Sequence, residues 1–122
     1  MQNLEQIRAR HALKFANEYG AEVTGVQGGE VIKKIPPIIM NHGLLATMAY
    51  SFSEKKRWEL VFDAIAQHLS SPAIAIVPAS VNDRSKLIEH LTSEATDSET
   101  LKRATSETMA WLEYARRFVK RD

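Results

Sequence analysis

Residues 36–52 read PPIIMNHGLLATMAYSF, an order that predicts two short helices joined at a glycine. Pro36 and Pro37 suit the first turn of a helix, because the N–H groups of that turn have no intrahelical partner. Gly43 suits the end of this helix, since a left-handed backbone costs glycine little. A second helix is expected over residues 44–52. Because the segment carries almost no charge, most of it should be buried.

Helical signals also precede and follow this segment. Asn3 is a good N-cap for a helix over residues 3–19, and Gly20 is a stop signal. Residues 24–29 predict a loop. Residues 31–41 predict a helix with a break before Pro36, because an interior proline costs about 3 kcal/mol. Ser53 is expected to cap a helix over residues 54–69 whose apolar residues form an amphipathic stripe beginning at Trp58.

Residues 73–77 form a short apolar run between two prolines, and alone they could be a strand. With no second strand candidate to pair with, we expect a buried linker that lays Ile74 and Ile76 on the core. A helix over residues 82–91 should follow. A capping-box pattern at residues 96–99 predicts the start of a long last helix, reaching about residue 119, with Trp111 in its core stripe. The predicted fold is an all-α, compact bundle of five to six helices, with no sheet, forming one domain over residues 1–122.

Composition limits the classes of function. The 122 residues include no cysteine, which excludes disulfides and thiolate chemistry. No apolar run approaches the ~20 residues of a membrane helix, and no secretory signal is present, so we expect a cytoplasmic protein without a membrane role. The net charge is only +1, unlike a protein that binds nucleic acid alone. Cations dominate residues 1–57 and the last nine residues, whereas carboxylates dominate residues 83–113.

No motif indicates catalysis. The four histidines, at positions 11, 42, 68 and 90, show no metal-ligand spacing, so we interpret them as surface or packed side chains. His42 adjoins Gly43, and its ring or backbone is expected to help cap that helix junction; a special role is the alternative. Nucleophile and phosphate-loop patterns are missing from the sequence. Glu107 is expected to accept hydrogen bonds within the bundle or from a neighbouring subunit. We therefore predict no enzyme activity, no cofactor and no metal.

Basic residues are the remaining candidates for a binding site. Arg10 and Lys14 lie four residues apart on one helix face, where like charges repel unless an anion is bound. Cations at the start of the helix expected from residue 54 oppose its macrodipole, which also suggests an external anion. The alternatives are an ordinary solvated face and, near the C-terminus, cations that complement a helix dipole. The complete set of candidate RNA-binding residues is Arg8, Arg10, Lys14, Lys55, Lys56, Arg57, Arg116, Arg117, Lys120 and Arg121.

Three segments together resemble a known family. They are residues 8–12 (RARHA), the segment 36–52, and residues 104–118 (ATSETMAWLEYARRF). This pattern resembles the small (fifth) subunit of the Cmr-type, type III-B CRISPR RNA-silencing complex. His42 stands where the family usually has Asn, and Leu101 where an aromatic is common. The positions that match are Arg8, Ala9, Ala12, Pro36 or Pro37, Ile39, Gly43, Leu44, Trp58, Thr105, Glu107, Leu112, Arg117 and Phe118.

The resemblance implies a non-catalytic helical protein. Copies of such a subunit stack into a minor filament beside backbone and large subunits, and line the path of the guide and target RNA. The contacts would be to phosphate and sugar, because base pairing with the guide already supplies sequence specificity. The competing hypothesis is a helical protein–protein adaptor with no nucleic-acid role. A transcription regulator is a third possibility, but no helix-turn-helix with an exposed basic recognition helix is evident.

Overall fold

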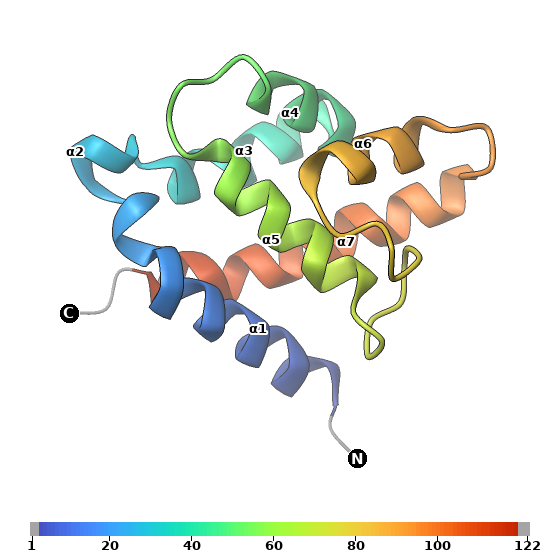
Figure 1. Cartoon of the computed structure of the whole chain (residues 1–122), viewed down its shortest axis with the longest axis horizontal. Coiled ribbons are helices and arrows are strands. Elements are labelled where there is room, and N and C mark those ends of the chain that lie inside the picture. The colour runs from blue at the N-terminus through green and yellow to red at the C-terminus, as the bar shows by residue number, and fades with distance from the viewer. Residues whose placement is uncertain (1–2, 120–122) are drawn as a thin grey trace.

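The computed structural model describes residues 3–119, and Figure 1 shows that helices make up its architecture. Six helices of eight or more residues occur in this part of the chain, with no strand, so the predicted all-helical bundle is confirmed. None of these helices is both long and apolar enough to cross a membrane. The elements are α1 (Leu4–Tyr19), η1 (Gly20–Glu22), α2 (Gly25–Gly28), α3 (Val31–His42), α4 (Leu44–Ser51), α5 (Trp58–Ser70), α6 (Arg84–Thr92) and α7 (Ser98–Phe118).

The first and last helices, α1 and α7, make the most extensive helix–helix contact among the described residues. They lie side by side and run in the same direction (Figure 1). Three contacts in ascending order along both helices establish this direction. Arg8 binds Glu107, the ring of Phe15 packs 5.4 Å from that of Trp111, and Gly20 lies against Val119. The two helices therefore join sequence segments from opposite ends of the chain.

Helix α5 lies at the centre and contacts α1, α4, α6 and α7. Its apolar stripe is buried as predicted, from Trp58 at 2% exposure to Leu69 at 0%. One apolar cluster includes side chains from all six of the longer helices. Its largest fully enclosed members are Trp58, Trp111, Phe62, Ile32, Ile35, Met48, Ile65, Leu69, Leu87 and Leu112.

Polar caps begin three of the helices. Asn3 is the N-cap of α1, as the sequence predicts, and it forms a reciprocal capping box with Gln6 through hydrogen bonds of 2.9 and 3.0 Å. Asp83 caps α6 and Asp97 caps α7 by accepting hydrogen bonds from the backbone N–H of Lys86 and Thr100. The last helix thus begins within the expected segment, but its N-cap is Asp97, and the predicted capping box between Thr96 and Glu99 does not form because the Thr96 hydroxyl donates to the carbonyl of His90.

The predicted break before Pro36 is wrong. Helix α3 continues through both prolines, and it buries Val31, Ile32 and Ile39 on its inner face. Pro37 is exposed and Pro36 is only half-buried. The backbone hydrogen bonds that the prolines remove are therefore lost on the outer face of α3, and the face that packs in the core keeps its hydrogen bonds. Burial of the apolar face therefore outweighs the local cost of the prolines.

The helix junction at Gly43 is confirmed. Gly43 has φ of 91°, a region that favours glycine, and its N–H donates to the carbonyl of Ile39 at 2.8 Å. The exposed residue His42 ends α3. The backbone turns here so that α3 and α4 pack against each other.

The start predicted for the fourth helix is also wrong. Helix α5 begins at Trp58, four residues after the expected position, and the Ser53 hydroxyl donates to the carbonyl of Tyr50 rather than capping α5. The hydroxyl continues the hydrogen-bonding of the preceding helix, which competes with a cap. Lys55 and Lys56 consequently lie in a connecting loop, so the argument from an unfavourable helix dipole does not apply to them.

Two irregular segments differ partly from expectation. The loop predicted over residues 24–29 contains the single turn α2. In the linker over residues 73–77, Ile74 and Ile76 are half-buried and Val77 is the side chain that enters the core. The N–H groups of Ile76 and Val77 both donate to the carbonyl of Leu69, which ties the linker back to the end of α5.

The position of Trp111 generates a stability prediction. Its side chain is 1% exposed between α1 and α5, so Trp111→Ala should lower the free energy of unfolding by about 3–5 kcal/mol. Urea denaturation followed by circular dichroism measures this change. Met40→Ala, at a residue 76% exposed, is the control and should change stability by less than about 0.5 kcal/mol. Equal effects of the two substitutions would contradict the core position of Trp111.

Candidate functional site

A buried carboxylate joins three helices. Glu107 on α7 is 6% exposed and accepts hydrogen bonds from Nε and Nη2 of Arg8 on α1, both at 2.7 Å. Such a two-pronged guanidinium–carboxylate contact is short and directional. Nε2 of His68 on α5 lies 2.9 Å from the same carboxylate. The expectation that Glu107 accepts hydrogen bonds within the bundle is confirmed.

A second histidine extends this cluster. Nδ1 of His11 on α1 lies 2.8 Å from Nδ1 of His68, with the rings at 83° to each other. Because the carboxylate of Glu107 only accepts, we assign the proton of neutral His68 to Nε2. Nδ1 of His68 then accepts, and Nδ1 of His11 donates. The order of donation is therefore His11 to His68 to Glu107, with Arg8 donating to the same carboxylate. We call these four residues the polar chain.

Burial and hydrogen bonding shift the protonation of the polar chain. Burial lowers the pKa of His68, although the hydrogen bond to Glu107 acts in the opposite direction. Burial also lowers the pKa of His11, helped by the positive charges of Arg10 and Lys14. Burial alone would raise the pKa of Glu107, but hydrogen bonds from Arg8 and His68 outweigh it and the pKa is lowered. Near neutral pH the chain thus holds two neutral imidazoles, a carboxylate and a guanidinium.

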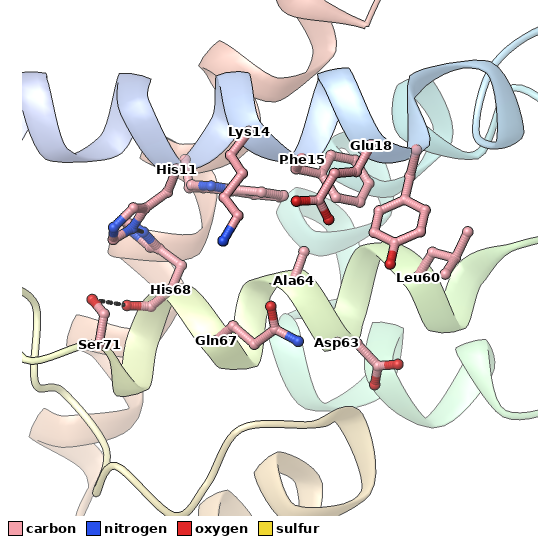
Figure 2. Close-up of a pocket in the computed structure, with 12 residues that line it drawn as sticks. His11, Lys14, Phe15, Glu18, Leu60, Asp63, Ala64, Gln67, His68 and Ser71 are labelled. Carbon is pink, nitrogen blue, oxygen red and sulfur yellow. Dashed lines mark hydrogen bonds between the residues drawn. The ribbon is translucent and has the colours of Figure 1, made fainter.

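A cavity of about 280 Å³ opens beside the polar chain, between α1 and α5. Figure 2 shows His11 and His68 at one end, with the amine of Lys14 directed into the gap between the helices. Glu18 and Asp63 lie toward the opposite end. The residues around the cavity also include Phe15, Tyr19, Leu60, Ala64, Gln67, Ser71 and Trp111.

Several predicted binding residues are engaged in ion pairs. Arg57 binds Glu22 at 3.0 Å and Glu59 at 3.5 Å. Arg116 and Arg117 both bind Glu113, at 3.2 and 3.1 Å, and these contacts lower the pKa of Glu113. All of these pairs are on the surface. Arg8 differs from them, because its partner is buried and only 26% of its own side chain is exposed.

The other candidate cations are exposed. Arg10 lies on the outer part of α1. Within residues 3–119, Lys14, Lys55 and Lys56 form no ion pair. Lys120 and Arg121 lie outside the described residues.

The fold brings the cations of the loop before α5 and those at the end of α7 to one end of the molecule. Both lie against the segment η1–α2. Glu22 binds Arg57 and Gly29 lies against the side chain of Lys56, while Gly20 lies against Val119. The loop before α5 and the end of α7 therefore flank the same segment, as their positions in Figure 1 also show. We call this the basic end, formed by Lys55, Lys56, Arg57, Arg116 and Arg117.

Sequence reasoning missed the pairing of His11 with His68, which are separated by 57 residues. A signal was present in each helix. His11 occupies the apolar stripe of α1, and His68 follows Ile65 by three residues on the buried side of α5. A histidine within an apolar stripe predicts a buried polar partner, but not which one.

These features define a class of protein, a small helical scaffold with a buried polar cluster and exposed cations. Residues 3–119 contain no group of three or more His, Cys, Asp or Glu side chains placed to hold a metal ion. Glu107, Arg8 and His68 are hydrogen-bonded to one another.

Comparison with known proteins identifies the family. The family model of the CRISPR-associated protein Cas_Cmr5 matches residues 4–121. The chain belongs to this family and is a small subunit of a Cmr-type CRISPR complex. The fold is similar to the X-ray crystal structure of a CRISPR-associated Cmr5 family protein from Thermus thermophilus. That similarity has a TM-score of 0.72 and 22% identity, and covers 98% of this chain and 96% of that chain. No curated protein matches the sequence.

The first prediction from the polar chain concerns Arg8. Arg8→Gln should lower the free energy of unfolding by about 2–3 kcal/mol, because it leaves a buried carboxylate without two charged hydrogen bonds. Arg103→Gln, at an exposed position on the same helix as Glu107, is the matched control and should be nearly neutral. Chemical denaturation compares the two variants. An Arg8 variant as stable as wild type would show that the guanidinium does not hold this cluster.

The second prediction concerns pH. Because the folded pKa of His68 is lowered, the unfolded chain binds the proton first, and stability should fall as pH drops below about 6.5. The folded pKa of Glu107 is also lowered, so its contribution persists at higher pH and is lost only at pH values below its unfolded pKa of about 4.3. The fall between about pH 7 and about pH 5 thus reports the histidines. Urea denaturation across this range measures it.

The control for this experiment is His90→Gln, which should leave the pH dependence in place, whereas His68→Gln should reduce it to the part that His11 contributes. His90 lies on α6, a helix that carries no member of the polar chain. Equal stability of the wild-type protein at both ends of the range would contradict the assignment of a neutral buried imidazole.

Proposed function

We propose that this chain is a non-catalytic small subunit of a type III-B CRISPR ribonucleoprotein complex that acts in antiviral defence. Several copies stack into a minor filament, and each copy contacts the backbone of the guide–target RNA. The family assignment supports membership of the complex. The complex would operate in the cytoplasm, where no disulfide is required of its subunits.

One observation carries the RNA contact: five of the candidate cations gather at the basic end, from segments that are distant in the sequence. Three cations in the loop before α5 and two at the end of α7 flank the segment η1–α2. A polyanion attracts several neighbouring cations more strongly than isolated ones, because its charges act together. Phosphate and sugar contacts of this kind hold a strand in register without reading its sequence.

The surface ion pairs do not prevent this role. Exposed pairs contribute only about 0–1 kcal/mol each, so Arg57, Arg116 and Arg117 exchange a carboxylate for a phosphate at little cost. Before RNA binds, Glu22 and Glu113 hold these guanidinium groups in defined positions. The overall charge remains near zero, which suits a subunit that also packs against other proteins.

Arg8 has a different role in this proposal. Nε and Nη2 of Arg8 each donate a hydrogen bond of 2.7 Å to the carboxylate of Glu107. Without these two hydrogen bonds the buried carboxylate would be largely uncompensated, which would destabilise the fold. We therefore assign Arg8 to the stability of the fold and the RNA contacts to the exposed cations. Lys14 and Arg10 on α1 belong to the second group.

A protein-contact surface is needed as well, and α3 and α4 supply a candidate. Met40 is 76% exposed and Tyr50 is 46% exposed. Tyr50, Ile38 and Ala46 line an apolar hollow of about 320 Å³ together with His42. Apolar side chains grouped in this way favour contact with another subunit. The same surface is the observation that favours the alternative function, a protein–protein adaptor without a nucleic-acid role.

The test uses the assembled complex. A variant with Lys55→Gln, Lys56→Gln, Arg116→Gln and Arg117→Gln should lose RNA at a lower salt concentration than wild type, because fewer counterions are displaced. Retention of labelled RNA during salt elution measures this. Circular dichroism should show an unchanged fold, since Lys55, Lys56 and Arg117 are exposed and the side chain of Arg116 is 42% exposed.

The matched control replaces four cations elsewhere: Lys34→Gln, Lys86→Gln, Lys102→Gln and Arg103→Gln. It should retain RNA as wild type does. Equal loss from both variants would mean a general charge effect rather than a basic end that binds RNA. Full retention by both, with all protein subunits still present, would favour the adaptor function.

A further inference from the structure

The cavity between α1 and α5 holds polar groups that the fold does not use. Within residues 3–119, the side chains of Lys14, Glu18 and Gln67 at its edge make no hydrogen bond or ion pair. Nε1 of Trp111, which also lines the cavity, is buried without a hydrogen-bond partner. Buried donors are nearly always paired in proteins, by protein, water or ligand. The buried indole N–H therefore calls for a polar partner, and the exposed side chains of Lys14, Glu18 and Gln67 are available to a ligand at the edge of the same cavity.

The polar chain determines which atom of His11 faces this ligand. Glu107 accepts from Nε2 of His68, so Nδ1 of His68 accepts from Nδ1–H of His11. The lone pair of neutral His11 is therefore on Nε2. This nitrogen has no partner among the described residues and is not among the buried unpaired atoms, so solvent reaches it. A proton added at Nε2 breaks no existing hydrogen bond. Instead, it strengthens the one that His11 donates to His68.

We propose that protonated His11 and Lys14 form a phosphodiester-binding subsite at this end of the cavity. The ligand is one phosphate of an RNA backbone, bound by Nε2–H of His11 and Nζ of Lys14. This inference rests on the proposed function, which it refines by adding one phosphate contact on α1, separate from the basic end. His68 and Glu107 are positioning residues, because they fix the tautomer of His11 without touching the phosphate.

The local charges favour an anion at this end. On α1, Arg10 and Lys14 act on His11 as positive charges. Lys14 is three residues from His11, which places both side chains on one face of the helix. His68 on α5 is neutral, and the carboxylate of Glu107 on α7 is already bound by Arg8. The free carboxylate of Glu18 lies two helical turns from His11, and Asp63, toward the same end as Glu18 in Figure 2, accepts from the N–H of Arg84.

Binding at such a site is linked to protons. The surrounding cations and burial oppose the charged form of His11 in the free protein. A bound phosphate reverses the charge balance, so His11 takes up a proton as the ligand binds. The affinity should therefore rise as the pH falls. The rise should end where His68 also becomes protonated, because two protonated Nδ1 atoms cannot remain 2.8 Å apart.

The experiment uses the full chain and dimethyl phosphate, which stays a monoanion throughout the range and carries neither base nor sugar. Histidine ring nitrogens are followed by ¹⁵N NMR during titrations at constant ionic strength. The free protein should show His11 protonated at Nδ1 and His68 at Nε2. Saturating dimethyl phosphate should raise the pKa of His11. The affinity should be several-fold higher at about pH 5.5 than at about pH 8.

Controls are present within the chain. His90 on α6 reports non-specific anion binding and should not respond. Lys14→Gln should abolish the response of His11, whereas Lys34→Gln, at an exposed lysine on α3, should leave it intact. A short single-stranded RNA should compete with dimethyl phosphate for the site. These results together would support the proposal.

Three outcomes would overturn it. In the first, neutral His11 carries its proton on Nε2. In the second, uridine perturbs His11 but dimethyl phosphate does not, which would make the cavity a base pocket. In the third, His90 responds as strongly as His11. None of these outcomes affects the salt-elution test of the assembled complex, so the subsite can fail while the proposed function stands.

Discussion

The carboxylate of Glu107 is the constraint on which the arrangement of helices depends. Burying an isolated carboxylate is costly, so α7 can pack in this orientation only if α1 and α5 supply donors at the same point. Arg8 and His68 supply three hydrogen bonds of 2.7 to 2.9 Å. Because the guanidinium of Arg8 binds with two nitrogen atoms, it fixes the rotation of α1 relative to α7 and the distance between them. The carboxylate therefore sets how the first and last helices of the chain align.

Such a cluster contributes more to specificity of packing than to net stability. The electrostatic attraction within a buried ion pair roughly offsets the free-energy cost of removing both charges from water. A protein with apolar side chains of similar volume at these positions would therefore often be equally stable. The polar chain, however, accepts only one alignment of α1, α5 and α7, whereas the apolar contacts around Trp111 and Phe15 would tolerate small slips. It also determines the tautomer of His11, and so links the interior of the bundle to a cavity at its surface.

The sequence predicts the fold well wherever the deciding signal is local. Asn3, Gly43 and the segment around Asp97 mark helix boundaries, because caps and left-handed residues act within one turn. Prediction fails where packing overrides the local signal: α3 continues through Pro36, and Ser53 does not begin α5. The candidate site shows the same division. The hydrogen-bonding role of Glu107 could be predicted, but its partner Arg8 lies 99 residues away, and no local pattern identifies that contact.

The proposed RNA contact raises the question of how a chain of net charge +1 could bind a polyanion. At the basic end, guanidinium groups are paired with Glu22 and Glu113 rather than left alone. These pairs lower the cost of crowding cations in the free subunit, and being exposed they are weak enough to exchange. In the filament that we propose, a modest affinity of each copy would be sufficient, because neighbouring copies would hold the same strand and raise its local concentration. A subunit of this kind needs only a local excess of positive charge, aligned with that of the next copy.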